Sequence, residues 1–268
     1  MLLFAALLAL TAPAQTLQLL SEFRRVDPKG ELRLSDAAGK PREILSPGLI
    51  RNGFYSLRVV IRPPKGQPYT LDLAQNPENS VILKLYREVG DTLLPVKTPV
   101  TGVGAAPESF WLDMQVPAAA LVRRVRVEVD LHDGDTWHMA PMELRILRGI
   151  LPALKPQAVE LLAASKPSDE FARQAWREWL CAVEPKPAPR TPGVSARGLI
   201  YRNALQDVAL ARILQIKFGR EELLKRVLDA FESPSQEAFC GGERPVSPLG
   251  PDGYLRVRDL LNREASRQ

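Results

Sequence analysis

Between residues 54 and 147, apolar side chains recur at every second position, and this alternation constrains the fold more than any other feature of the sequence. Successive side chains of a β-strand point to opposite faces, so the pattern predicts strands with one buried and one exposed face. The alternating runs are residues 54–62, 69–75, 80–89, 108–116, 122–131 and 136–147. With about seven short strands and turn-forming residues between them, residues 15–150 are expected to form an antiparallel, immunoglobulin-like β-sandwich.

The last of these runs contains a proline. Proline cannot donate a hydrogen bond to a neighbouring strand, so Pro141 predicts that residues 136–147 lie at a sheet edge or carry a bulge.

After residue 151 the apolar spacing becomes helical. Residues three and four apart share a face in the segments 168–183, 199–218, 220–231 and 254–264, and Gly219 is expected to end the second of these helices. Residues 184–193 hold four prolines and predict a stiff linker. We therefore expect an α+β chain in two parts, with the sandwich followed by a small all-α domain over residues 151–268.

The first residues resemble an export signal. An apolar run at residues 1–14 ends in Ala12-Pro13-Ala14, which is typical of a secretory signal peptide cleaved after Ala14. The run is too short to span a bilayer comfortably, and no later apolar run is longer. We therefore predict a secreted or periplasmic protein whose mature chain has no transmembrane segment.

Export changes the interpretation of the two cysteines. In an oxidising compartment an even pair favours a disulfide, so we expect Cys181 and Cys240 to be bonded. The bond would close a loop of roughly 60 residues and stabilise the fold by about 2–4 kcal/mol.

Charge and motifs restrict the function. The formal net charge is +5, spread evenly with no basic block, so nucleic-acid binding is not expected. Neither a Gly-x-Ser-x-Gly nucleophile motif nor a glycine-rich phosphate loop is present. We expect a non-enzymatic binding protein whose partner is a protein or glycan of the cell envelope. The first alternative is a hydrolase that attacks envelope or extracellular polymers through paired carboxylates.

Both histidines lie in DLHDGDTWH, residues 130–138. Placing Trp137 in the core requires a three-residue hairpin loop, His132-Asp133-Gly134, with Val129 opposite Trp137 and His138 opposite Glu128 on the outer face. The second alternative function is metal binding here, with Asp130, His132 and His138 as ligands of zinc. Residues 250–264 resemble half of a calcium loop but lack several carboxylate ligands, so no cofactor is expected beyond these zinc or calcium alternatives.

The stretches REILSPGLIRNGFYSLRVVI, QNPENSVILKLYRE and APMELRIL resemble a family of uncharacterised secreted proteins from acidobacteria. The resemblance covers residues 40–148 and implies export and a single β domain. It implies no catalytic residue and no ligand.

Overall fold

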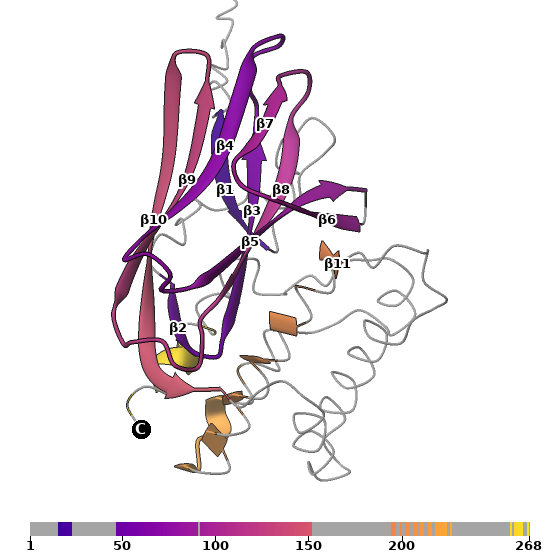
Figure 1. The fold of residues 1–268 in the computed structure, drawn as a ribbon. Coiled ribbons are helices and arrows are strands. Elements are labelled where there is room, and N and C mark those ends of the chain that lie inside the picture. The colour runs from indigo at the N-terminus through magenta and orange to yellow at the C-terminus, as the bar shows by residue number, and fades with distance from the viewer. Residues whose placement is uncertain are drawn as a thin grey trace, which may run out of the picture.

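Two β-sheets pack face to face in the computed structural model of the chain (Figure 1). The structure describes residues 16–22, 47–90 and 92–151, together with individual positions within 194–226 and 258–267. All neighbouring strands are antiparallel except β2 and β10, which pair in parallel. The architecture within the described residues is therefore a β-sandwich, as the alternation predicts.

In the described part of the chain, the first sheet has six strands and the second has five. In spatial order the first contains β1 (Leu17–Ser21), β3 (Phe54–Ile61), β8 (Glu108–Gln115), β5 (Ile82–Val89), β6 (Thr92–Val96) and β11 (Val194–Ser195). The second contains β2 (Gly48–Arg51), β10 (Thr136–Ile150), β9 (Arg124–Asp133), β4 (Pro68–Asn76) and β7 (Val100–Val103).

The core lies between the sheets and is built from the alternating residues of both. Its fully buried members include Leu57, Val59, Phe110, Leu112, Val127, Val129, Leu131 and Leu144. Each comes from one side of its strand, so a period of two in the sequence becomes one continuous apolar layer.

The six alternating runs correspond to β3, β4, β5, β8, β9 and β10, which confirms those predictions. Pro141 lies where β10 pairs with β9 only, because β2 joins β10 from Arg145 onward. The expected edge position of this proline is confirmed. The short strands β1, β2, β6, β7 and β11 were not predicted, since runs of two to five residues contain too few alternations.

Only part of the expected helical domain over residues 151–268 lies among the described residues. Described positions are helical between 196 and 218, at 221–223 and 226, and between 258 and 267, and many of them pack on the sandwich. Gly219 has φ 66° and donates its N–H to the carbonyl of Gln215, so it ends the first helical stretch as predicted. These described positions alone do not show a separate all-α domain.

Several predictions concern parts of the chain outside the described residues. These are the signal peptide at 1–14, the helix at 168–183, the linker at 184–193 and the pair Cys181 and Cys240. Among the described residues, none of the helical stretches is both long and apolar enough to cross a membrane.

Replacing Leu112 by Ala tests the core. Leu112 lies in the central strand β8 and is fully buried, so we expect the free energy of unfolding to fall by about 2–5 kcal/mol. Urea denaturation measures the loss. Leu94→Ala is the matched control, because Leu94 is 40% exposed and its truncation should cost less than about 1 kcal/mol. Equal losses would contradict the assigned core.

Candidate functional site

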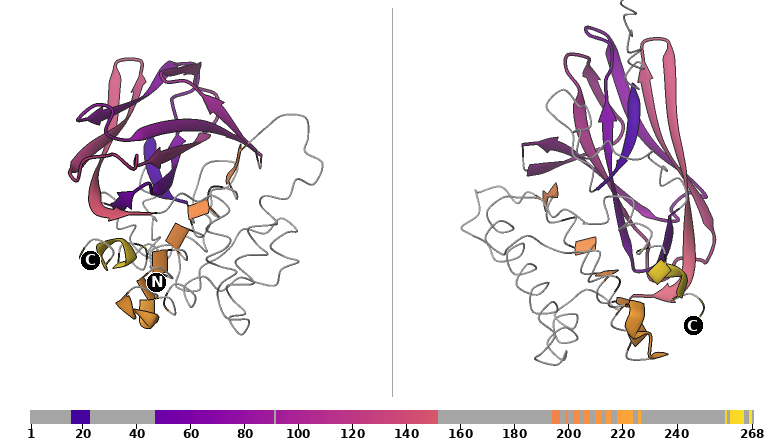
Figure 2. Two further views of the ribbon diagram at one scale, coloured as in Figure 1. Left: turned by 60° about the horizontal axis from the view of Figure 1, so that its bottom comes forward. Right: turned by 180° about the vertical axis from the view of Figure 1, so that it is seen from behind.

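The outer faces of the two sheets differ in what covers them. On β3 and β8 of the first sheet, the residues that alternate with the core are buried too: Ser56, Arg58 and Asp113 are at most 4% exposed. Helical positions after residue 196 pack there, beside the sandwich in both views of Figure 2. On β9 and β10 of the second sheet, outward residues are exposed or half-buried. One outer face is thus an internal interface, whereas no described residue covers the outward side chains of β9 and β10.

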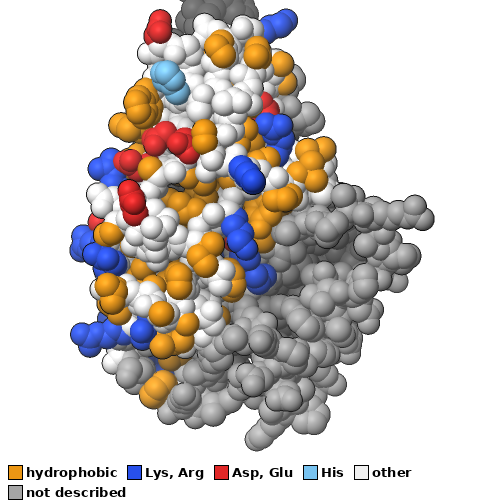
Figure 3. Space-filling view, viewed as in Figure 1, with side chains coloured by type: hydrophobic (Ala, Val, Ile, Leu, Met, Phe, Trp, Pro, Cys, Tyr) orange, Lys and Arg blue, Asp and Glu red, His pale blue; other side chains and the backbone are white. Residues whose placement is uncertain are grey.

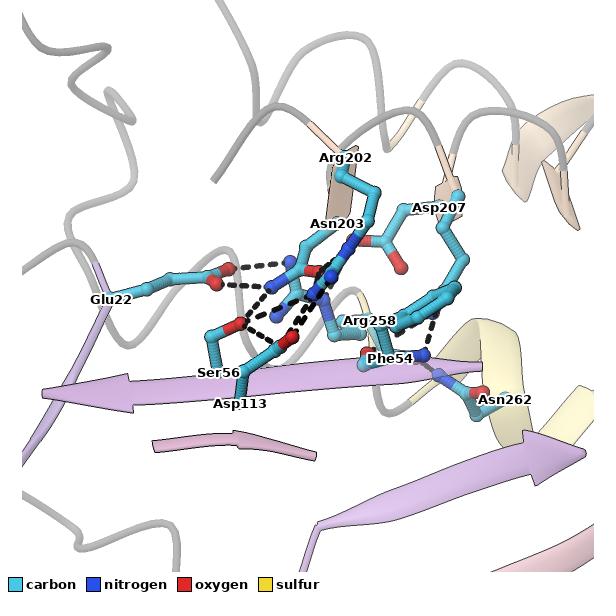
Figure 4. Close-up of polar contacts among 10 residues, drawn as sticks. Glu22, Phe54, Ser56, Asp113, Arg202, Asn203, Asp207, Arg258 and Asn262 are labelled. Carbon is cyan, nitrogen blue, oxygen red and sulfur yellow. Dashed lines mark hydrogen bonds and ion pairs between the residues drawn. The ribbon is translucent and has the colours of Figure 1, made fainter. Parts of the chain in front are cut away.

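A buried polar cluster, which we call the interface cluster, joins the first sheet to the helical positions (Figure 4). Its centre is Asp113, whose two carboxylate oxygens accept hydrogen bonds of 2.6 and 3.0 Å from the Arg202 guanidinium. Ser56 donates to the same carboxylate over 2.8 Å. The Arg202 guanidinium also lies 4.0 Å from the centre of the Phe54 ring. A bidentate ion pair combined with ring stacking fixes both the position and the angle of the guanidinium.

A second part of the interface cluster surrounds Glu22. Asn203 donates to one oxygen of this carboxylate over 2.6 Å, and Arg258 contacts the other over 2.7 Å. Arg258 also donates to Asp207 over 2.7 Å, so one guanidinium bridges two carboxylates (Figure 4). Complete burial raises the pKa of Glu22, and the charge of Arg258 opposes this shift only in part.

Two side-chain amides bind strand backbone next to the interface cluster. Gln206 accepts from the Phe54 N–H over 2.7 Å and donates to the Phe54 carbonyl over 3.4 Å. Asn262 accepts from the Ile50 N–H over 3.1 Å. These contacts span 152 and 212 residues of sequence. Because its carboxylates are held by arginine and asparagine side chains inside a packed interface, the cluster is suited to positioning the C-terminal segments.

The outward side chains of β4, β9 and β10 form the exposed surface that we call the open face. Cross-strand pairing arranges them in five rows, which from the hairpin tip are Thr70–His132–Trp137, Asp72–Asp130–Met139, Ala74–Glu128–Pro141, Asn76–Arg126–Glu143 and Arg124–Arg145. Trp137 is 66% and Met139 59% exposed. Figure 3 shows acidic side chains in the upper part of this side and mostly basic ones below them. The open face is therefore apolar and acidic near the tip and basic at its other end.

Asp130 lies at the acidic end of the open face. Partial burial raises its pKa, the nearby carboxylates of Glu128 and Asp72 raise it further, and a hydrogen bond from the Trp137 side chain lowers it. Asp72 stands directly opposite Asp130 on the neighbouring strand. Like charges in this position repel and destabilise the sheet.

The register predicted for the β9–β10 hairpin is wrong. Thr136 pairs with Asp133, so the loop is the two residues Gly134 and Asp135 rather than residues 132–134. Gly134 has φ 52°, as the first loop position of a type II′ turn requires. Trp137 and Met139 consequently point outward.

His138 lies opposite Leu131 on the core side of β10. Its ring Nε2 is 3.3 Å from an oxygen of Asp133, which is itself buried. The prediction assumed that the largest apolar side chain must be inside. Here the inward position instead holds a histidine with a polar partner, and a shift of one residue reverses every side chain.

This register separates the three predicted metal ligands. Asp130 and His132 point outward from β9, whereas His138 points to the core side. Over the described part of the chain, no group of three or more His, Cys, Asp or Glu side chains is arranged to hold a metal ion. Of residues 250–264, which resemble half of a calcium loop, only position 258 and positions 260–264 are described.

The sequence interpretation missed the interface cluster, although strand β8 carried a signal for it. Its residues Phe110, Trp111 and Leu112 are apolar on both faces, which is typical of a strand covered on both sides. An aspartate next in such a strand predicts a buried partner. The partner, Arg202, is 89 residues away, and nothing in the sequence specifies it.

Comparison with known proteins identifies no family. No protein-family model matches the chain, and no curated protein matches its sequence. A family 123 glycoside hydrolase from Clostridium perfringens is similar in structure, with a TM-score of 0.35 and 9% identity over 61% of this chain. The chain spans only 35% of the length of that hydrolase.

Two smaller β-proteins are also similar. SSP-19, an MSP-domain-like protein of Caenorhabditis elegans, has a TM-score of 0.24 and 7% identity. The match covers 37% of this chain and 94% of the SSP-19 chain. The class 5 fimbriae chaperone CfaA has a TM-score of 0.23 and 13% identity over 39% of this chain and 54% of its own. Likeness at this level assigns neither a family nor an activity. The resemblance to acidobacterial secreted proteins stays a prediction.

Replacing Asp113 by Ala tests the interface cluster. It deprives the largely buried Arg202 of its carboxylate, so we expect the free energy of unfolding of the full chain to fall by about 2–4 kcal/mol. Urea denaturation gives the value. Asp72→Ala, on the open face, is the control and should change it by less than about 0.5 kcal/mol. A loss no larger than the control's would refute the role of this ion pair.

The raised pKa of Glu22 predicts that the stability of the folded protein depends on pH. Because its pKa in the folded state lies above the ordinary value of 4.5, the folded protein holds this proton more tightly than the unfolded chain. The resulting stabilisation is complete below pH 4.5 and is lost as the pH rises through the raised pKa. The test compares the unfolding free energy of the wild type with that of Glu22→Gln. The difference, wild type minus variant, should decrease as the pH is raised from 4.5 to neutrality. An increasing difference would mean that Arg258 dominates over burial.

Proposed function

We propose that the protein is an exported, non-enzymatic binding protein whose partner docks on the open face. The observation that supports this most is the exposure of Trp137 and Met139, at 66% and 59%, on a sheet face that no described residue covers. Tryptophan and methionine are both enriched at protein interfaces, and tryptophan is among the residues that most often dominate the binding free energy. Charged residues surround them, as at the polar rim of an interface.

The interface cluster supports the same proposal from the opposite side. It packs the chain's own C-terminal positions on the outer face of the first sheet, whereas no described residue covers the outward side chains of β4, β9 and β10 in the second. Export, expected from residues 1–14, places the partner in the periplasm or outside the cell.

Recovery of a partner from envelope extract by the immobilised full chain tests this function. We expect Trp137→Ser combined with Met139→Ser to reduce recovery at least about tenfold, because a buried interface tryptophan commonly contributes 2 kcal/mol or more. The matched control is Leu121→Ser with Val122→Ser, which removes exposed apolar surface outside the open face. It should bind like the wild type. Equal recovery by both double variants would contradict docking on the open face.

A further inference from the structure

We infer that the partner of the open face docks through an arginine-bearing segment, whose guanidinium binds at Asp72, Asp130 and Trp137. We call these three residues, together with Met139, the acidic–aromatic end of the open face. The inference rests on the proposed function and names the chemistry that the partner carries. It follows from an exposed indole beside two carboxylates to which no described cation is bound.

The two carboxylates face each other across neighbouring strands. Asp72 on β4 is directly opposite Asp130 on β9, where side chains lie about 5 Å apart. Asp72 accepts a hydrogen bond from the Leu73 N–H over 2.8 Å, and Asp130 accepts one from the Trp137 side chain. Among the described residues, neither carboxylate forms an ion pair. A cation from outside the chain would therefore relieve their mutual repulsion.

The neighbouring arginine of β9 does not neutralise this pair. Arg126 lies two rows away and is ion-paired with Glu128. Its charge lowers the pKa of Asp130, but partial burial and the carboxylates of Glu128 and Asp72 keep that pKa above its usual value. Because Asp130 is partly withdrawn from water, its attraction to a cation that approaches it is stronger than at a fully exposed carboxylate.

The exposed aromatic surface lies next to the carboxylates. Met139 is in the same row as Asp72 and Asp130, and Trp137 is one row nearer the tip, opposite His132. The rings of His132 and Trp137 are 5.8 Å apart and tilted by 57°, and the indole stays 66% exposed. Since the indole reaches Asp130, a cation bound to that carboxylate can also lie within roughly 6 Å of the ring, where cation–π attraction acts.

A guanidinium fits these groups better than a metal ion or a neutral sugar does. Calcium takes about six or more oxygen ligands, whereas no group of three potential metal ligands occurs among the described residues. A sugar would cover the indole but leave the two carboxylates repelling each other. A guanidinium is planar, stacks on aromatic rings and binds carboxylates through paired N–H groups. Met139, which is 59% exposed, offers apolar surface to the methylene stem of an arginine.

Fluorescence anisotropy of a short labelled peptide of alternating arginine and serine, titrated with the full chain, tests the inference. The matched ligand carries citrulline, the uncharged isostere of arginine, at every arginine position. We expect saturable binding of the arginine peptide and at least about tenfold weaker binding of the citrulline peptide, because citrulline keeps the shape but loses the charge.

Variants of the chain locate the binding site. Asp72→Asn with Asp130→Asn should raise the dissociation constant of the arginine peptide at least about tenfold, because it removes both charges. Trp137→Ser should raise it about threefold, the size of an exposed cation–π contact. The control Glu78→Gln with Glu221→Gln neutralises two exposed carboxylates elsewhere. It has the same net charge as the first variant and should bind like the wild type.

Two results would overturn the inference, once circular dichroism has shown that the variants are folded. One is equal affinity for the arginine and citrulline peptides. The other is unchanged affinity of Asp72→Asn with Asp130→Asn for the arginine peptide. Binding of a neutral oligosaccharide such as cellohexaose, without binding of the arginine peptide, would also overturn it and would indicate a glycan partner.

Capture from envelope extract separates this inference from the proposed function. Asp72→Asn with Asp130→Asn should recover at least about tenfold less partner than the wild type, as Trp137→Ser with Met139→Ser does. If the aspartate substitutions leave recovery unchanged while the substitutions of Trp137 and Met139 abolish it, the arginine contact fails and docking on the open face stands.

Discussion

The bidentate contact between Asp113 and Arg202 joins the two halves of the chain. Strand β8 is central in the first sheet, so a charged side chain on its outer face must be paired once that face is covered. Arg202 supplies the pairing and brings with it Asn203, which reaches Glu22 and Ser56. The burial of this outer face, and with it the division of the sandwich into a closed and an open side, depends on that ion pair.

A polar interface restricts the C-terminal positions more than an apolar one would. Apolar contacts tolerate sliding, whereas a bidentate ion pair and amide bonds to strand backbone each require one alignment. Gln206 binds the backbone of Phe54, and Asn262 binds that of Ile50, at strands of different sheets. Charged partners contribute little net stability when buried, because desolvation offsets most of their attraction. The interface cluster is thus better explained by positional specificity than by its contribution to stability.

The sequence predicts the sandwich well because the alternation of apolar and polar residues is visible within each strand. Runs such as residues 122–131 specify which face is buried without reference to other strands, and β9 shows that face as expected. The predicted hairpin register is wrong because it places Trp137 in the core, whereas the pairing of Thr136 with Asp133 turns this side chain outward. The interface cluster depends on residues far apart in sequence. Pairings of that range leave no periodic signal along the chain.

The outward position of Trp137 is what gives the open face its character. In the predicted register Trp137 and Met139 would have filled the core, and the outer face would have carried His138 in their place. The observed two-residue turn reverses this assignment at the tip, and the same reversal puts Met139 in line with Asp72 and Asp130. Exposed apolar surface beside two facing carboxylates is unfavourable in an isolated chain, even though the Trp137 side chain donates a hydrogen bond to Asp130. A partner that carries positive charge and buries Trp137 and Met139 would reduce both penalties, which is the reason for proposing that a partner docks on this face.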